Sequence, residues 1–216
     1  MARIKNIEKL TFKDFIVDLD LYFGLTEGLT QLPCPHEINI NGVLYSVPAI
    51  DTFTDNICYG QRLYMARQED NDIELIARMI GGYYYPLITN QKWSEDNLLL
   101  IAKNVLTCKI KDLYPITMHF VELIGQIIDK EKKLLYREPS KVEMAAGIEK
   151  LSVFSELNAL DFLRDAMKCT VPEVLLTPYN ECLVRFLNAK ELSDYQERYF
   201  ELLKEKADAE LKFKKR

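Results

Sequence analysis

Apolar residues recur at helical spacing through most of the chain beyond residue 48, and this periodicity constrains the fold more than any other feature. In one segment the apolar residues are one, three or four positions apart, so they share one face of a helix: Ile73, Ile76, Ala77, Ile80 and Tyr84. Two later segments repeat the pattern, with Leu98, Ile101, Ala102 and Val105 after a start at Ser94, and Ile116, Phe120, Leu123, Ile124 and Ile127 after a start near Leu113. Three consecutive amphipathic helices predict a helical bundle.

Two earlier segments carry signals for the start of a helix. Thr54 and Asp55 offer a cap for a helix that reaches about Gln68. Thr11–Asp14 has a hydroxyl followed three positions later by a carboxylate, which is typical of a helix start. The alternation from Phe15 to Phe23 fits a strand as well as a helix, so both interpretations stay open there.

The clearest strand signal lies near the N-terminus, where "HEINI" and "VLYSV" flank Asn41-Gly42. Asn-Gly readily takes the positive φ angles that a two-residue type I′ turn requires. We therefore predict a β-hairpin here. Almost all of the strand signal precedes residue 50, so the expected fold is mainly α, a multi-helix bundle with a small N-terminal β-hairpin.

A charged stretch, "DKEKKLLYREPSKVEMAAG" at residues 129–147, is broken by Pro139 and suggests an exposed connection or a mobile helix end. We expect a hairpin and helical bundle over 1–130, the connection over 131–147, and a C-terminal helical region over 148–216, which packs with the first region or stands apart. The C-terminal region should hold a helix at Leu157–Met167, one opened by Thr170–Glu173 as a capping box, and a long terminal helix. Pro178 should break or kink the middle one. One face of the terminal helix collects Leu192, Tyr195, Tyr199, Leu202 and Leu203.

Composition excludes several classes of protein. A chain of 216 residues with 48% hydrophobic residues can bury a sizeable core. The longest apolar run, Leu98–Ala102, is far too short to cross a bilayer, and the first residues lack the apolar stretch of a secretory signal. Five widely spaced cysteines without a CxxC pair indicate thiols in a reducing cytoplasm. The net charge of −5 argues against direct nucleic-acid contact, although the last residues are basic.

Catalytic and metal-binding motifs are weak. His119 and Glu122 stand one helical turn apart, as in di-iron sites, but those sites need a second such pair. Cys34-Pro-His36 offers two ligands, whereas structural zinc uses four. Asp18 and Asp20 would point to one side only in a strand. No phosphate-binding glycine loop, nucleophile elbow or His-Glu-x-x-His is present. We expect no catalytic residue, cofactor or metal.

The stretch "MIGGYYYPLI" at residues 79–88 places three tyrosines between two glycines and a proline. Helical phase puts Gly81, Tyr83 and Tyr84 on or beside the apolar face, where Gly81 would let a neighbouring backbone approach. Pro86 disfavours the helical conformation of the preceding residue. We therefore expect the helix to end at Pro86 and Tyr85 to remain available to a partner.

The order of these segments resembles a class of viral proteins. The runs "INGVLYSVPAIDTFTDNICYGQRLYMARQ", "LIARMIGGYYYPLI" and "KWSEDNLLLIAKNVLTCKIKDLYPITMHFVELI" resemble small helical proteins of tailed bacteriophages and prophages of Bacteroides-type gut bacteria, the crAss-like phages among them. Those proteins are neck or tail ring components and tail assembly chaperones. Residues 38–125 carry the resemblance. It implies a protein without an active site that works through its surfaces, as part of a virion ring or as an aid to tail assembly.

The expected function is that of a non-enzymatic structural protein of the phage neck or tail. It would be made in the cytoplasm of the bacterial host and built into the virion as a homo-oligomeric ring beside other phage structural proteins. Aromatic residues are enriched at interfaces, and the candidate contacts are Tyr45, Tyr59, Tyr64, Tyr85 and Trp93. The alternatives are a cytoplasmic tail assembly chaperone, and a metal-dependent enzyme or nucleic-acid-binding factor that uses dispersed acids such as Asp18 and Asp20.

Overall fold

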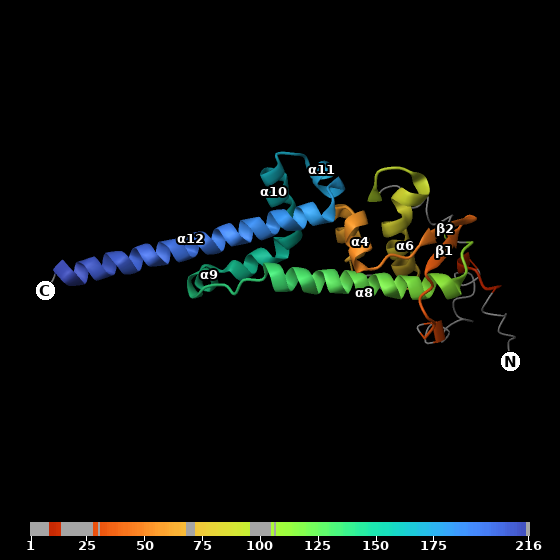
Figure 1. The fold of residues 1–216 in the computed structure, drawn as a ribbon, viewed down its shortest axis with the longest axis horizontal. Coiled ribbons are helices and arrows are strands. Elements are labelled where there is room, and N and C mark those ends of the chain that lie inside the picture. Colours follow the sequence, from red (N-terminus) through yellow and green to blue (C-terminus); the bar gives the residue numbers. More distant parts are fainter. Residues whose placement is uncertain are drawn as a thin grey trace.

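Helices dominate the described residues of the computed structural model, and a two-stranded hairpin stands towards the N-terminal end (Figure 1). The structure describes residues 9–13, 28–29, 31–67, 72–95, 105 and 107–214. Its elements are β1 Glu37–Ile40, β2 Val43–Ser46, α4 Ile50–Asn56, α5 Tyr59–Met65, α6 Asp72–Thr89, α8 Ile110–Leu135, α9 Lys141–Ala146, the 3-10 helix η3 Ile148–Phe154, α10 Ser155–Met167, α11 Val171–Leu176 and α12 Tyr179–Lys214. The predicted mainly-α fold with a small hairpin is confirmed.

The hairpin forms as Asn41-Gly42 predicts. Both turn residues have positive φ angles, 54° and 83°, and the strands pair antiparallel with Ile40 opposite Val43. The side-chain oxygen Oδ1 of Asn39 accepts a hydrogen bond from the Gly42 amide at 2.9 Å. The Tyr84 hydroxyl of α6 donates to the Ser46 carbonyl of β2 at 3.1 Å and thereby connects the hairpin to α6.

The segment after the hairpin differs from the sequence prediction. Thr54 and Asp55 do not start a helix to Gln68, because they lie inside the short helix α4. The next helix, α5, begins after Cys58, whose amide donates to Oε1 of Gln61 at 2.9 Å. Gln61 thus supplies the acceptor that an N-terminal amide needs, three residues into the helix. The prediction relied on the commoner capping residues and so placed the start too early.

Aromatic side chains fill the contact between α4, α6 and α8. Phe53 stacks on Tyr83 with ring centroids 5.2 Å apart, and both rings contact Phe120. Tyr84 is fully buried on the same side, so the predicted inward face of α6 is confirmed at Tyr83 and Tyr84. The α8 stripe is also confirmed, since its five residues are buried: Ile116, Phe120, Leu123, Ile124 and Ile127. The helix starts at Ile110, three residues before the predicted start.

Near the N-terminus, the predicted helix start at Thr11 is only partly described. Thr11 pairs with Lys109 in an isolated β-bridge, and helix follows at Phe12 and Lys13. The amide of Phe12 donates to the Cys108 carbonyl at 2.8 Å. The choice between helix and strand over Phe15–Phe23 lies outside the described residues, and so does most of the helix predicted after Ser94.

Residues 129–147 are partly helical instead of forming an open connection. The long helix α8 continues to Leu135, and α9 follows with a Ser140–Glu143 capping box and a left-handed Gly147 at its end. The predicted Thr170–Glu173 capping box opens α11, and the helix ends before Pro178 as expected. The division of the chain at 131–147 stays a prediction.

The C-terminal helices contact the N-terminal ones at several places. α11 packs on α5, and the first part of α12 packs on α8, α4 and α5. Between α5 and α8, Nε and Nη2 of the Arg62 guanidinium donate to the two carboxylate oxygens of Glu131 in a bidentate ion pair whose side chains are only 15% and 17% exposed. Among the described helices, none is long and apolar enough to cross a membrane.

The helix α12 extends far past the other elements (Figure 1). Its last described polar contacts with α8 and the residues after it come from Lys190, which donates to the Leu134 carbonyl at 2.8 Å, and from Glu197, which accepts from Arg137 at 2.8 Å. Every described side chain from Tyr195 to Glu210 is exposed. Apart from the ion pair between Glu197 and Arg137, the outer half of α12 is therefore a single helix surrounded by solvent.

Candidate interaction surface

The predicted aromatic contacts are for the most part not on the surface. Tyr59, Tyr85 and Trp93 are 6%, 0% and 8% exposed, so their expected accessibility to a partner is wrong for the isolated chain. Tyr45 and Tyr64 are half-buried: Tyr45 packs edge-on against Tyr84, and Tyr64 lies against Trp93. Aromatic residues bury large areas in cores as well as in interfaces, and composition does not separate the two roles.

Tyr85 is buried because α6 does not end at Pro86. The helix continues to Thr89, although a proline inside a helix leaves the carbonyl four residues earlier without its amide donor. That carbonyl belongs to Gly82, and it accepts a hydrogen bond from Nε2 of Gln61 at 2.6 Å. The Tyr85 hydroxyl donates to Oε1 of Gln91 at 3.2 Å. A side chain from α5 thus replaces the missing donor, and the expected helix end at Pro86 is wrong.

The candidates for chemistry do not converge on a site in the part of the chain that the structure describes. Nε2 of His119 lies 2.9 Å from the Pro48 carbonyl, a contact between α8 and the loop after the hairpin. Among the described residues, no group of three or more histidine, cysteine, aspartate or glutamate side chains is placed to hold a metal ion. Asp18 and Asp20 lie outside the described residues.

The five cysteines are free thiols. Burial raises the pKa of Cys108 to about 11 and that of Cys182 to about 12, and it also raises the pKa of Cys34 and Cys58. A thiol is a nucleophile only when it ionises, so these four groups are poor nucleophiles at neutral pH.

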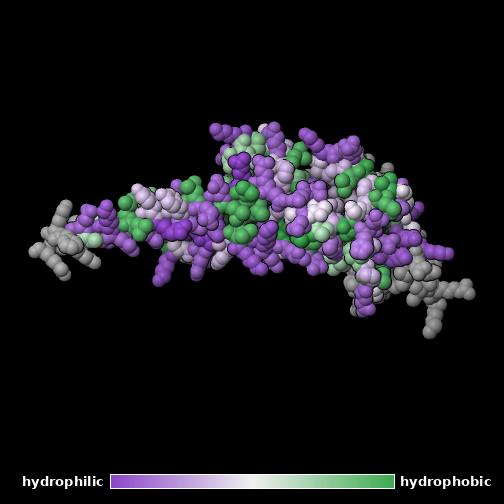
Figure 2. All heavy atoms as spheres, in the orientation of Figure 1, coloured by the Kyte–Doolittle hydropathy of each residue, from purple (hydrophilic) through white to green (hydrophobic). Residues whose placement is uncertain are grey.

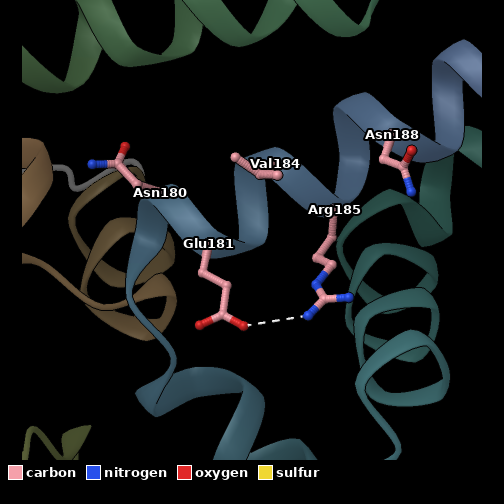
Figure 3. Close-up of a pocket in the computed structure, with 5 residues that line it drawn as sticks. All are labelled: Asn180, Glu181, Val184, Arg185 and Asn188. Carbon is pink, nitrogen blue, oxygen red and sulfur yellow. Dashed lines mark ion pairs between the residues drawn. The ribbon is translucent and has the colours of Figure 1, made fainter.

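A different surface lies along α12. Near its start, Asn180, Glu181, Val184, Arg185 and Asn188 line a hollow of about 560 Å³ (Figure 3). Glu181 and Arg185 extend to the same side and form an ion pair at 3.6 Å, and Val184 is 61% exposed beside them. Nδ2 of Asn180 donates to Oδ1 of Asp55 at 2.8 Å, which fixes this end of α12 against α4.

Farther along, the same side of α12 becomes apolar. At 100° per residue, residues 181, 184, 188, 192, 195, 199, 202, 203 and 206 stay within one stripe of the helix surface. Five of its large side chains are between 45% and 64% exposed: Leu192, Tyr195, Tyr199, Leu202 and Leu203. We call these five residues the α12 stripe. Hydrophobic residues interrupt the hydrophilic surface along this helix (Figure 2).

The α12 stripe points away from the rest of the protein. Among the described side chains of α12, the buried ones are Tyr179, Cys182 and Leu183, and on average they lie about half a turn from the stripe. The rings of Tyr195 and Tyr199 stack on each other, with centroids 6.2 Å apart and planes 18° apart. The stripe is thus an ordered apolar surface that nothing in the described chain covers.

The sequence identified the apolar face of the terminal helix but not its exposure. A spacing of three and four residues indicates one apolar face, and in most helices that face is the buried one.

No protein-family profile matches the chain, and no curated protein and no solved structure is detectably similar to it.

Proposed function

We propose that this protein is a non-enzymatic structural component of a tailed-phage virion, a neck or tail ring protein that acts through contacts with its own copies and with other virion proteins. The observation that carries the proposal is the projecting outer half of α12 with its uncovered apolar stripe. Large apolar side chains gathered on an exposed helix are typical of a surface that a partner covers. The resemblance of residues 38–125 to phage neck and tail proteins is the reason for assigning this surface to a virion.

A protein built into the particle is present in purified virions. Mass spectrometry of gradient-purified particles should detect it at a ratio to the major capsid protein that stays constant through repeated purification. The alternative, a cytoplasmic tail assembly chaperone, would be abundant in lysates of infected cells and absent from the particles. A chain missing from both fractions during productive infection would contradict both assignments.

Two matched substitutions test whether incorporation into the virion depends on the α12 stripe. Leu202→Glu places a charge in the α12 stripe, whereas Val142→Glu makes an equal charge change at a side chain of α9 that is 78% exposed. We expect the first variant to be lost from particles, or to stop their assembly, and the second to be incorporated normally. Equal incorporation of both variants would show that the stripe is not the contact surface.

A further inference from the structure

The outer half of α12 carries a heptad pattern. With Leu192 as position a, the a positions are Leu192, Tyr199 and Lys206, and the d positions are Tyr195, Leu202 and Ala209. Residues at a and d form the contact line of a coiled coil, and the flanking e and g positions set its orientation and partner. Residues 192–209 are all exposed apart from the half-buried Asp194, and they span about 27 Å of helix. Phe200 lies outside the contact line and packs edge-on against Tyr199.

We propose that a second copy of this chain covers the α12 stripe, with the two α12 helices running antiparallel and Tyr199 opposite the partner's Leu202. In this register Leu192 lies opposite the partner's Ala209, and Tyr195 lies opposite the partner's Lys206. The ammonium of Lys206 can then lie over the tyrosine ring, an arrangement that attracts a cation. Because the pairing is two-fold symmetric, each contact occurs twice.

The flanking charges select this register. Arg198 and Glu205 occupy g positions, and in an antiparallel coiled coil the g positions of the two helices meet. In the proposed register Arg198 lies opposite the partner's Glu205, twice by symmetry. A shift of one heptad in one direction places Arg198 opposite the partner's Arg198, and a shift in the other direction places Glu205 opposite the partner's Glu205. Both shifts therefore bring like charges together.

The parallel arrangement is also disfavoured. Parallel helices in register would bring the two Lys206 ammonium groups together on the contact line. They would also place Glu205 at g against the partner's Glu210 at e. Antiparallel pairing avoids both contacts and meets no steric obstacle, because the stripe faces away from the side on which α12 packs. The last turn of the partner's α12 then ends beside the hollow at Asn180–Asn188.

The test is sedimentation velocity on the full-length chain over a dilution series. The expected result is a monomer–dimer equilibrium. Arg198→Glu should weaken dimerisation about tenfold, because two attractive contacts become two repulsive ones. Glu205→Arg should weaken it similarly, and the double variant should restore it. Lys204→Glu makes the same charge change as Arg198→Glu on the far side of the helix and should leave the equilibrium unchanged. Circular dichroism of each variant shows whether α12 stays helical.

Three outcomes would overturn the inference: a chain that stays monomeric at every concentration, an association that Arg198→Glu does not weaken, or a double variant that fails to recover. The inference concerns the same surface as the proposed function but does not require a virion. A dimer with this charge dependence from a protein absent from particles would defeat the proposed function alone. A virion protein that is monomeric in solution would defeat only the pairing.

Discussion

Nε2 of Gln61 donates a hydrogen bond at 2.6 Å to the Gly82 carbonyl, the group that Pro86 deprives of its helical donor. Gln61 is 2% exposed and Gly82 is buried, so this hydrogen bond lies away from solvent. The same side chain accepts from the Cys58 amide at the start of α5. One amide group therefore completes two helices, with its nitrogen serving α6 and its oxygen serving α5.

Gln61→Leu should lower the free energy of unfolding by about 1–3 kcal/mol, the cost of leaving buried polar groups unsatisfied. Chemical denaturation followed by circular dichroism measures the loss. Pro86→Ala restores an amide that can donate to the Gly82 carbonyl, so Gln61→Leu should cost less in that background. Equal costs in the two backgrounds would show that Gln61 does not replace the missing donor.

The packing between α5 and α11 leaves no room for a side chain at Gly60. A Cβ added at Gly60 would lie 2.6 Å from Cζ3 of Trp93 and 2.9 Å from the Leu175 carbonyl oxygen. The backbone oxygen cannot move without shifting α11, and Trp93 is buried, so Gly60→Ala should destabilise the fold by about 1–3 kcal/mol. Thermal unfolding measures the effect.

The control for Gly60→Ala is the same substitution on α8. A Cβ at Gly125 meets no atom within 4 Å outside its chain neighbours and the adjacent helix backbone, so Gly125→Ala should raise the free energy of unfolding by about 0.5–1 kcal/mol, because alanine favours the helix. The two substitutions should therefore shift the melting temperature in opposite directions. Shifts of the same sign would contradict the close packing at Gly60.

Local signals in the sequence predicted the parts of the fold that local chemistry determines. Asn41-Gly42 forms its turn from two residues, and Thr170 and Glu173 form their capping box within one helical turn. The buried faces of α6 and α8 follow from periodicity alone. Pro86 is different, because α6 tolerates this proline only with the help of Gln61. Gln61 donates to the Gly82 carbonyl, which lies 21 residues later in the chain. A tertiary contact of this kind leaves no trace in the local pattern.

For a similar reason, the sequence predicts the apolar face of the candidate surface but not its exposure. Periodicity collected Leu192, Tyr195 and Tyr199 on one face, but exposure depends on how far α8 extends beneath α12, and no local pattern encodes that length. The expected aromatic contacts are wrong in the opposite sense, because Tyr59 and Trp93 have the residue type of an interface but are buried. The ring of Tyr59 packs on Phe186 of α12, and the ring of Trp93 packs on Tyr64 of α5. Residue type alone indicates an interface role for these side chains, whereas the tertiary structure places them in the core.

Alkaline pH should unfold the protein through its buried tyrosines. Burial raises the pKa of Tyr59 and of Tyr83 to about 12, and it also raises the pKa of Tyr84 and Tyr179. The unfolded chain releases these protons near pH 10, whereas the folded chain retains them to higher pH. The unfolded state therefore binds fewer protons in this window, and stability present below about pH 10 is lost as the pH rises towards 12.

A pH titration that follows tyrosinate absorbance and circular dichroism together checks this expectation. Part of the tyrosine absorbance change should coincide with the loss of helical signal. Ionisation of all twelve tyrosines near their ordinary pKa, with the helical signal unchanged, would contradict the burial of the four.

Tyr85 and Tyr136 provide the sharpest contrast between a buried and an exposed tyrosine. Tyr85 is 0% exposed, and its hydroxyl has a partner in Gln91, whereas Tyr136 follows α8 with 68% of its surface exposed. Tyr85→Ala should lower the free energy of unfolding by about 3–5 kcal/mol, because it leaves a cavity in the core. Tyr136→Ala should change it by less than about 0.5 kcal/mol. Tyr85→Phe keeps the ring and should cost only about 1 kcal/mol. Urea denaturation of the three variants separates these effects. A Tyr85→Ala protein as stable as Tyr136→Ala would contradict the burial of Tyr85 and make this tyrosine a candidate partner contact again.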